Sequence, residues 1–257
     1  MLLAADVGNT EIVVGVFDGP RLEQTWRLST RPERTSDELT LALAGFLAQR
    51  GIDFEADVTG LVVASVVPDV TAAFREMAQR AFPFPPVLVG PGTRTGVPIL
   101  TDNPREVGAD RVVNTLAAFT KFGGPAIVVD FGTATNFDIV SANGEFVGGV
   151  IAPGMQASAA SLFSRTARLT RVELTAPSSV IGKSTVEAIQ SGLIFGTAGE
   201  VDAIVTRIQG ELGKSTVVAT GGLAPVVIPH CRTVDHHEPW LTLEGLRLVF
   251  EKNPADA

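Results

Sequence analysis

The sequence contains a single cysteine, Cys231, among its 257 residues. One cysteine excludes a disulfide within the chain, and such scarcity is typical of proteins from a reducing cytoplasm. The chain also lacks an uninterrupted apolar run long enough to cross a bilayer. We expect no signal peptide, because Asp6 interrupts the first apolar segment and no basic residue precedes it. These absences predict a cytoplasmic protein with no membrane partner.

Positive charge is scarce as well. Lys and Arg total 20 against 28 Asp and Glu, which gives a net charge of −8. Such acidity argues against nucleic acid or an anionic membrane as the main partner. An anionic substrate would therefore need a local site built from backbone N–H groups, cations or a metal ion. The length supports one large domain or two of about 120 residues, each with its own core.

Several well-known motifs of phosphate and metal chemistry are incomplete. Gly182-Lys-Ser-Thr185 and Gly213-Lys-Ser-Thr216 look like the ends of P-loops, but Pro177 and Ile208 stand where the earlier glycine is required. No Gly-x-Gly-x-x-Gly follows a strand, which makes a dinucleotide-binding fold improbable. The three histidines lack the accompanying thiols or carboxylates of a zinc site. The P-loop is therefore rejected, a dinucleotide fold is not expected, and solvated loop histidines are preferred to a zinc centre.

The first nineteen residues predict a β-hairpin. An apolar run ends at Asp6, a polar turn follows at Gly8, Asn9 and Thr10, and an alternating run returns over residues 12–17. Glycine lets the backbone approach a ligand, and the two polar side chains add hydrogen-bonding groups beside exposed N–H groups. Asp6, at the strand end, suits a hydrated Mg²⁺. Taken alone, this stretch fits a phosphate-binding hairpin and an ordinary hairpin about equally well.

The same pattern recurs almost half a chain length later. Asp130-Phe-Gly-Thr-Ala-Thr135 follows one apolar run and precedes another. Two strand–Asp-x-Gly–strand units at the same place in each half indicate a duplicated fold with two phosphate-facing hairpins. Chance recurrence of a turn is the weaker interpretation. We expect lobes at residues 1–123 and 124–257, with the seam near Gly123-Gly124.

The remaining pattern predicts a mixed sheet flanked by helices in each half. In the first half, the expected strands and helices lie at 21–28, 35–50, 61–64, 69–81 and 87–89, and the capping box Thr35-Ser-Asp-Glu38 opens the first helix. In the second half, strands are expected at 125–130, 135–141, 145–150 and 216–220, with a long helix opened by the capping box Ser184-Thr-Val-Glu187. Gly192, Gly196 and Gly199 in that helix would allow close approach of another helix of the chain or of a second subunit.

Asn103-Pro-Arg-Glu106 predicts a helix start, with Asn103 as N-cap and Glu106 closing a capping box. The expected helix then contains Gly108-Ala-Asp-Arg111. The Asp110 carboxylate would lie on a partly apolar face of this helix. There it would either form a salt bridge that stabilises packing or act as the general base for a hydroxyl. Arg111 could instead grip a carboxylate substrate in bidentate fashion.

Taken together, these segments resemble the type III pantothenate kinases, a family of the acetate/sugar kinase, Hsp70 and actin superfamily. Each segment is short, but their order and spacing are specific. The similar segments are residues 6–10, 65–68, 103–111, 130–135, 148–154, 182–185, 219–222 and 243–246. The resemblance implies an α/β fold of the duplicated RNase H-like (actin-like ATPase) kind, with two mixed-sheet lobes flanked by helices and a cleft between them.

The resemblance also implies an activity, the ATP-dependent phosphorylation of the terminal (4′) hydroxyl of pantothenate, which is the first step of coenzyme A synthesis. Asp110 matches the family's proton acceptor, and Asp130 matches its ligand for an activating monovalent cation, K⁺ or NH₄⁺. The positions that match its ATP site, with Asp6 near Mg²⁺, are Asp6, Val7, Gly8, Asn9, Thr10, Glu11, Ile12, Val13, Thr133, Gly221 and Gly222. The positions that match its pantothenate site are Thr101, Gly108, Ala109, Asp110, Arg111 and Thr185.

In the family, the residue that Thr185 matches is delivered from the neighbouring subunit, so the resemblance implies a homodimer with its active site at or near the interface. Thr101 departs from the pattern, because family members usually carry tyrosine there and this chain has no tyrosine. Two alternatives stay open: another kinase of the superfamily, acting on a sugar or polyphosphate, and a non-catalytic regulatory protein that keeps the fold. Residues 108–111 argue against the first, and the retained Asp110 and Asp130 against the second.

Overall fold

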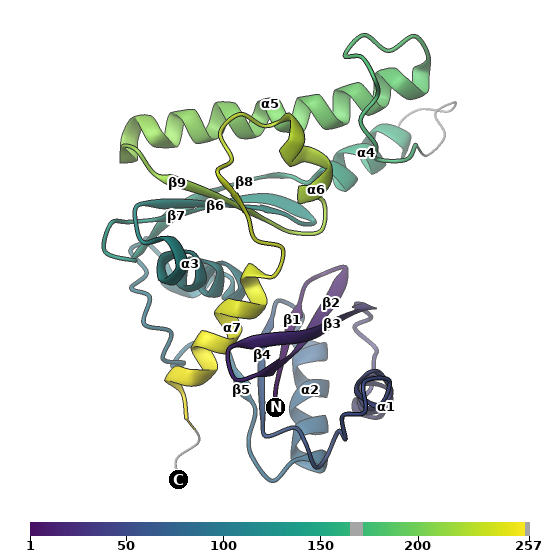
Figure 1. Ribbon diagram of the computed structural model, residues 1–257, viewed down its shortest axis with the longest axis vertical. Helices are drawn as coiled ribbons and strands as arrows, with labels where there is room; N and C mark the ends of the chain where they lie inside the picture. The colour runs from purple at the N-terminus through teal and green to yellow at the C-terminus, as the bar shows by residue number, and fades with distance from the viewer. Residues whose placement is uncertain (165–171, 255–257) are drawn as a thin grey trace. The chain divides into compact units, whose positions relative to one another are not determined.

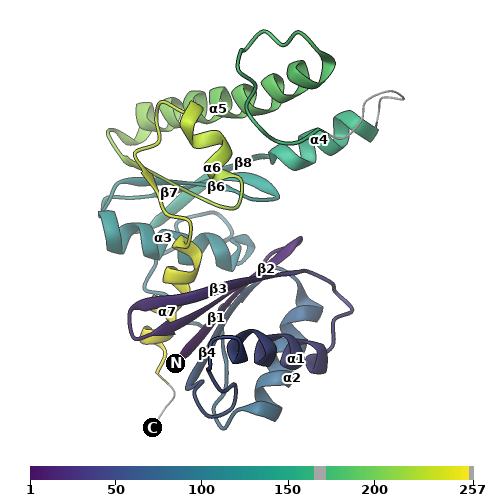
Figure 2. The same ribbon diagram turned by 45° about the vertical axis from the view of Figure 1, so that its right-hand side comes forward.

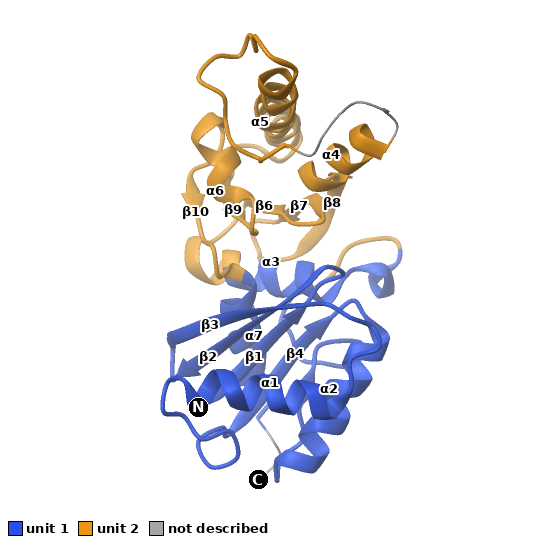
Figure 3. Cartoon of the chain, turned by 90° about the vertical axis from the view of Figure 1, so that its right-hand side faces the viewer, with its two compact units in different colours: residues 1–97, 103–117, 242–257 blue, residues 98–102, 118–241 orange. Residues whose placement is uncertain are grey.

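The computed structural model describes residues 1–164 and 172–254. The chain divides into two compact units, coloured blue and orange in Figure 3. Unit 1 contains residues 1–97, 103–117 and 242–257, and unit 2 contains residues 98–102 and 118–241. This division differs from the expected lobes, 1–123 and 124–257, mainly because the C-terminal segment returns to unit 1. Within the described ranges, no helix is both long and apolar enough to span a membrane.

Each unit is built on one five-stranded mixed sheet. The strands of unit 1 lie in the order β3-β2-β1-β4-β5 and comprise β1 (Leu2–Val7), β2 (Glu11–Asp18), β3 (Arg21–Ser29), β4 (Gly60–Ser65) and β5 (Val87–Leu88). Those of unit 2 lie in the order β10-β9-β6-β7-β8 and comprise β6 (Ala126–Phe131), β7 (Ala134–Val140), β8 (Phe146–Pro153), β9 (Thr216–Thr220) and β10 (His236–His237).

The two sheets share one topology. In each, the first three strands form an antiparallel meander, and the fourth and fifth join it in parallel. Read from the meander edge, the order 3-2-1-4-5 of unit 1 is repeated by 8-7-6-9-10 in unit 2. The predicted duplication of a mixed-sheet lobe is therefore confirmed.

Helices follow the strands at equivalent places. The helices that follow the third, fourth and fifth strands are α1, α2 and α3 in the first half and α5, α6 and α7 in the second, with α4 as an addition. Their bounds are α1 (Ser36–Ala48), α2 (Pro68–Ala81), α3 (Ala109–Phe122), α4 (Met155–Ser164), α5 (Thr185–Leu212), α6 (Ala224–Val227) and α7 (Leu241–Lys252), with 3₁₀ turns η1 (Pro104–Glu106) and η2 (Ile228–His230).

In unit 1, the helices cover both faces of the sheet (Figures 1 and 2). Alternate residues of β1, such as Leu3 and Val7, pack into a core with α1 and α2. On the opposite face, α7 lies against two strand glycines: a Cβ at Gly15 would lie 2.8 Å from Leu243 Cδ1, and one at Gly60 would lie 2.3 Å from Phe250 Cζ. Glycine in these strands therefore makes room for the C-terminal helix.

In unit 2, the main core lies between the sheet and α5. Ile127, Val129 and Phe137 from β6 and β7 meet Ile194 and Val201 of α5, and all five are fully buried. Complete burial of such a side chain contributes roughly 1.5–3 kcal/mol. Figure 1 shows α5 and α6 together on this side of the sheet.

Of the three predicted capping boxes, the one at Thr35 is complete, the one at Ser184 differs in one bond, and the one at Asn103 is absent. At α1, Thr35 Oγ1 accepts from the Glu38 N–H at 3.2 Å, and the Thr35 N–H donates to Glu38 Oε2 at 2.9 Å. The bond from the Thr35 N–H, and after it a bond from the Thr35 hydroxyl to Glu38 Oε2 at 3.2 Å, hold the pKa of the Glu38 carboxyl below its ordinary value. At α5, the Ser184 hydroxyl accepts from the Glu187 N–H as expected. The Glu187 carboxylate, however, accepts from the N–H of Lys183, one residue before the predicted donor, Ser184.

The helix predicted to begin at Asn103 starts later. Residues 104–106 form only the 3₁₀ turn η1, Val107 is extended, and α3 begins at Ala109. Asn103 Nδ2 donates to Glu106 Oε1 at 2.6 Å and makes no side-chain cap. The Gly108 carbonyl is the one that accepts the first helical N–H groups. Asp110 therefore lies in the first turn of α3 instead of its second.

Within unit 1, α3 and α7 cross at a glycine. A Cβ at Gly245 would lie 2.2 Å from the Val113 carbonyl oxygen, so no larger residue fits without separating the helices. Beside this crossing, Thr242 Oγ1 donates to Asn114 Oδ1 at 2.9 Å, and Asn114 is 1% exposed. The crossing is thus fixed by backbone contact and by one buried polar pair.

We expect Gly245→Ala to lower the free energy of unfolding by about 1–3 kcal/mol, because the new methyl group overpacks the crossing. The matched control is Gly45→Ala in α1, where a Cβ meets nothing within 4 Å. That exposed helical position should gain about 0.5–1 kcal/mol from the better helix former. Urea denaturation followed by circular dichroism measures the free energy of unfolding of both variants. Equal stability of the two would contradict the close crossing of α3 and α7 at Gly245.

Candidate active site

The first predicted phosphate hairpin is a tight β-turn between β1 and β2. The strands pair in register as far as Val7 and Ile12, and the Gly8 N–H donates to the Glu11 carbonyl at 3.0 Å. The turn residues Asn9 and Thr10 are exposed, as is Glu11. The turn therefore offers its polar groups to solvent or to a ligand.

Asp6 lies on the sheet face opposite the α1 and α2 core. It stands beside Val13 of β2 and Ala64 of β4, whereas its neighbours Ala5 and Val7 point into the core. Asp6 is partly exposed. A strand-end carboxylate in this position fits a hydrated Mg²⁺, which takes one or two protein carboxylates together with substrate phosphates.

The second predicted hairpin is equivalent but one residue shorter. β6 and β7 pair in register as far as Phe131 and Thr135, and the Gly132 N–H donates to the Ala134 carbonyl at 3.0 Å. Thr133 is exposed at the tip of the turn. Asp130 takes the place that Asp6 has in unit 1, because each is the last residue but one before its turn on the first strand of a sheet.

Gly221 and Asp130 lie side by side in unit 2. Asp130 pairs with Thr220, the last residue of β9, and a Cβ at Gly221 would lie 2.5 Å from Asp130 Oδ1. Gly221 also has φ +93°, a conformation that favours glycine. The structure therefore brings together the predicted cation ligand and the start of the predicted nucleotide-binding pair Gly221-Gly222.

The segment 108–111 forms the start of α3. A Cβ at Gly108 would lie 2.4 Å from Asp110 Oδ1, so the carboxylate occupies space that only glycine leaves free. Asp110 and Arg111 are both partly exposed in the first helical turn. The N-terminal end of a helix favours an ionised carboxylate. A partly exposed carboxylate at a fixed position is suited to accept a proton.

Thr101 follows an isolated β-bridge in unit 2. Ile99 forms a bridge with Phe146, and the Leu100 N–H donates to the Phe146 carbonyl at 2.8 Å. The Thr101 hydroxyl oxygen is buried and makes no hydrogen bond within the described parts of the chain. Its environment lacks the ring that a tyrosine would supply.

The predicted residues thus fall into two sets. Unit 1 contains Asp6, the turn after it and the segment 108–111, whereas unit 2 contains Asp130, Thr133, Gly221, Gly222, Thr101 and Thr185. Thr185 is exposed in the first turn of α5. A common cleft for the two sets remains a prediction.

Sequence reasoning missed two buried polar residues on the Asp130 face of the second sheet. Asp138 is 0% exposed and Thr220 is 2% exposed. The alternation of strand side chains contained the signal, because Asp138 follows Asn136 by two residues and Asn136 pairs with Asp130. This face of β6, β7 and β9 is therefore more polar than the sequence reading suggested.

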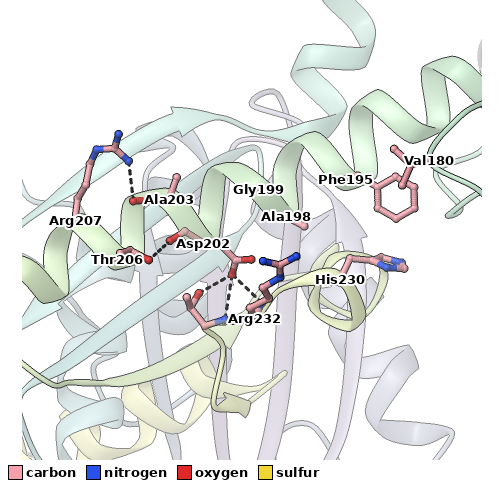
Figure 4. Close-up of a pocket in the computed structure, with 11 residues that line it drawn as sticks. Val180, Phe195, Ala198, Gly199, Asp202, Ala203, Thr206, Arg207, His230 and Arg232 are labelled. Atoms are coloured by element: carbon pink, nitrogen blue, oxygen red, sulfur yellow. Dashed lines mark hydrogen bonds between the residues drawn. The ribbon is translucent and has the colours of Figure 1, made fainter.

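A hollow of about 720 Å³ lies on the other side of unit 2, along α5 (Figure 4). None of the predicted site residues lines it. Its centre is Asp202, whose Oδ1 accepts from the Arg232 N–H, the Thr233 N–H and the Thr233 hydroxyl at 2.8–3.0 Å. Asp202 is thus engaged in holding the loop after η2 to α5, which is a structural role.

Cys231 lies next to this loop. Burial raises the pKa of its thiol to about 12, and the nearby Asp202 carboxylate adds to the shift. A thiol with so high a pKa holds almost no thiolate near neutral pH, which is the opposite of what a nucleophile needs. Among residues 1–164 and 172–254, no group of three or more His, Cys, Asp or Glu side chains is arranged around a common metal position.

Solved structures with this fold include the activator of 2-hydroxyisocaproyl-CoA dehydratase from Clostridium difficile with bound ADPNP. It aligns over 98% of this chain and 94% of its own, with a TM-score of 0.60 and 13% identity. A ROK family glucokinase from Streptomyces griseus, in complex with glucose and AMPPNP, aligns over 98% and 99% with a TM-score of 0.54 and 12% identity. At such low identity the likeness shows the fold alone, and it confirms the predicted duplicated α/β class.

Sequence comparison is more specific. The family model described as type III pantothenate kinase matches residues 2–207. A protein named type III pantothenate kinase from Frankia alni is 59% identical over 255 residues, which cover 98% of this chain and 100% of the relative. With the model matching most of the chain and this relative matching nearly all of it, the chain belongs to the type III pantothenate kinase family.

Proposed function

We propose that the chain transfers the γ-phosphoryl group of ATP to the terminal (4′) hydroxyl of pantothenate, the first step of coenzyme A biosynthesis. The observation that carries the proposal is the pair of equivalent hairpins, each with an aspartate at the same register position and an exposed polar turn. In a chain of this family, such a pair has an evident use in binding a triphosphate.

ATP is proposed to bind through both hairpins. Phosphoryl transfer depends on positioning and on neutralising charge, and backbone N–H groups in a tight turn supply both. Gly221 and Gly222 leave backbone free for the nucleoside part. Two proteins of the same fold hold ADPNP and AMPPNP in their solved structures, which supports a nucleoside triphosphate as the phosphoryl donor.

Mg²⁺ is proposed to be held at Asp6. When bound with ATP, the ion would neutralise charge on the phosphate oxygens. Asp6 is partly exposed and turned away from the apolar core, and only Val7 separates it from the first turn. These features fit a carboxylate that shares the ion with water and phosphate.

Asp110 is proposed to act as the general base. As the pantothenate oxygen bonds to the γ-phosphorus, its hydroxyl proton passes to Asp110, and the electron pair of the broken P–O bond leaves with ADP. Arg111, one residue on, is proposed to bind the carboxylate of pantothenate through its planar guanidinium. Gly108 contributes by leaving room for the Asp110 carboxylate.

A monovalent cation is proposed to bind at Asp130. A carboxylate beside the phosphates would repel them, and K⁺ or NH₄⁺ would offset that charge. Asp130 Oδ1 lies against the backbone of Gly221, in a position that a side chain on residue 221 would fill. Asp130 is partly exposed, which leaves its carboxylate within reach of a cation.

The chain is proposed to act as a homodimer that buries part of unit 2. Of the nine large hydrophobic residues exposed in the described parts of the chain, six lie between residues 147 and 186. Gly192, Gly196 and Gly199 of α5 also face open space, since a Cβ at each would meet nothing within 4 Å. They do not serve packing against another described helix of the same chain. A second copy on this face would bring Thr185 to the partner's site.

Pantothenate-dependent formation of ADP tests the proposed function and separates it from the alternatives. We expect turnover with pantothenate and none with sugars or without acceptor. Sugar-dependent turnover would identify another kinase of the superfamily. Nucleotide binding without any turnover would identify a regulatory protein.

In the same assay, Asp110→Asn should lower kcat by roughly 10²–10⁴-fold, because the base is lost while the side-chain shape is kept. The matched control is Asp69→Asn, which removes the acidic residue from the first turn of α2. The control should keep wild-type kcat, and near-normal turnover of Asp110→Asn would end the assignment of the base.

Replacement of K⁺ by Na⁺ tests the proposed cation site. We expect kcat/KM to fall by about tenfold or more when Na⁺ is the only monovalent cation, because Na⁺ neutralises the Asp130 carboxylate in a less suitable geometry. In Asp130→Asn the difference between the two salts should disappear. Equal rates of the wild type in K⁺ and Na⁺ would remove the cation from the mechanism.

Gly196→Glu should convert the protein to a monomer, because it places a charge and a bulky side chain on the open face of α5. The matched control is Gly210→Glu near the other end of the same helix, where a Cβ likewise meets nothing within 4 Å. Analytical ultracentrifugation gives the mass of each. A monomeric wild type, or a dimeric Gly196→Glu variant, would contradict the proposed interface.

A further inference from the structure

Thr30 stands immediately after β3, opposite the turn of the first hairpin. The pairing of β2 with β3 ends at Glu11 and Ser29, and Thr30 is the next residue. Its hydroxyl donates to the Gly8 carbonyl at 2.7 Å, and its backbone N–H donates to the Thr10 carbonyl at 2.9 Å. Thr30 thus forms hydrogen bonds with two of the four turn residues, Gly8 and Thr10.

These two bonds act on a turn whose side chains are exposed. The side chains of Asn9, Thr10 and Glu11 are exposed, so no apolar packing fixes the turn. A free turn would sample several conformations, and ordering it on binding would cost conformational entropy. Fixing the Gly8 and Thr10 carbonyls also fixes the Gly8–Asn9 and Thr10–Glu11 peptide planes, and with them the directions of the Asn9 and Glu11 N–H groups. Preorganised donors are what charge stabilisation requires.

The equivalent position in unit 2 performs the same task differently. Gly154 follows β8 directly after the Ala134–Pro153 pair, as Thr30 follows the Glu11–Ser29 pair in β3. A Cβ at Gly154 would lie 2.3 Å from the Thr133 carbonyl oxygen. Here the backbone itself supports the turn, with no room for a side chain. Both hairpins are therefore braced from the residue that follows the third strand.

We propose that Thr30 is a positioning residue for phosphoryl transfer, which holds the first hairpin in its nucleotide-binding shape through the Gly8 carbonyl. The inference rests on the proposed function of that hairpin. It makes a specific statement about kinetics: loss of the Thr30 hydroxyl affects the nucleotide and leaves pantothenate binding almost unchanged.

The test compares Thr30→Val with Thr30→Ser and Thr40→Val. Valine keeps the shape of threonine and the backbone bond to Thr10 but loses the hydroxyl. Serine keeps the hydroxyl. Thr40→Val is the matched control, because the Thr40 hydroxyl also donates to a backbone carbonyl, that of Ser36 at 2.9 Å, but within α1.

We expect Thr30→Val to lower kcat/KM for ATP about tenfold, with less than a twofold change in KM for pantothenate. Thr30→Ser should recover most of the loss, and Thr40→Val should match the wild type in both values. Unchanged ATP kinetics in Thr30→Val would overturn the proposal. An equal loss of kcat/KM for ATP and for pantothenate, seen in Thr40→Val as well, would also overturn it, since that pattern marks a purely structural role.

Calorimetric titration with MgADP separates this proposal from the proposed function, because it needs no acceptor. If the wild type binds MgADP but does not phosphorylate pantothenate, the proposed function fails, and weaker MgADP binding by Thr30→Val alone would still support the role of Thr30. Equal MgADP affinity in Thr30→Val and the wild type would overturn that role. A wild type that binds no nucleotide overturns both.

Discussion

The antiparallel pairing of the first two strands in each sheet is the constraint on which the rest of the structure depends. It sets the register that turns Asp6 and Asp130 away from the cores filled by α1, α2 and α5. A slip of one residue would bury each carboxylate among apolar side chains and expose its neighbours. The register is therefore fixed by the same burial that stabilises each unit, and the acids are fixed with it.

The turns depend on this register in a second way. Each closes with one hydrogen bond of its own, from Gly8 in unit 1 and from Gly132 in unit 2. Each is then supported from the residue after the third strand, by the hydroxyl of Thr30 or by the backbone of Gly154. A meander of three strands is thus the smallest unit that holds such a turn in one shape, and the chain contains it twice.

Much of this could be predicted from the sequence, because the signals are local. Alternating β-branched runs, the box at Thr35 and the repeated Asp-x-Gly turn each depend on a few neighbouring residues. The prediction failed at residues 103–108, where Asn103 and Glu106 bond to each other and Val107 is extended. Local rules favoured a helix there, but the first helical N–H groups donate to the Gly108 carbonyl, so the helix starts at Ala109.

Other features were beyond local signals. The return of α7 to unit 1 depends on Gly245 meeting the Val113 carbonyl, more than a hundred residues away in the chain. Thr30 and Gly8 are 22 residues apart, and nothing in the sequence around either one indicates the bond. Small residues and hydroxyls of this kind acquire their role only when the sheet brings their partners to them.

The central claim is that both hairpins hold the phosphates of one nucleotide while Asp110 faces the acceptor hydroxyl. A crystal structure of the protein with MgAMPPNP, K⁺ and pantothenate tests it most directly. The account predicts backbone N–H groups of both turns within hydrogen-bonding distance of the phosphates, with the Asp6, Asp110 and Asp130 carboxylates around the same ligands. A nucleotide bound by one turn only, or the three carboxylates on separate surfaces, would contradict it.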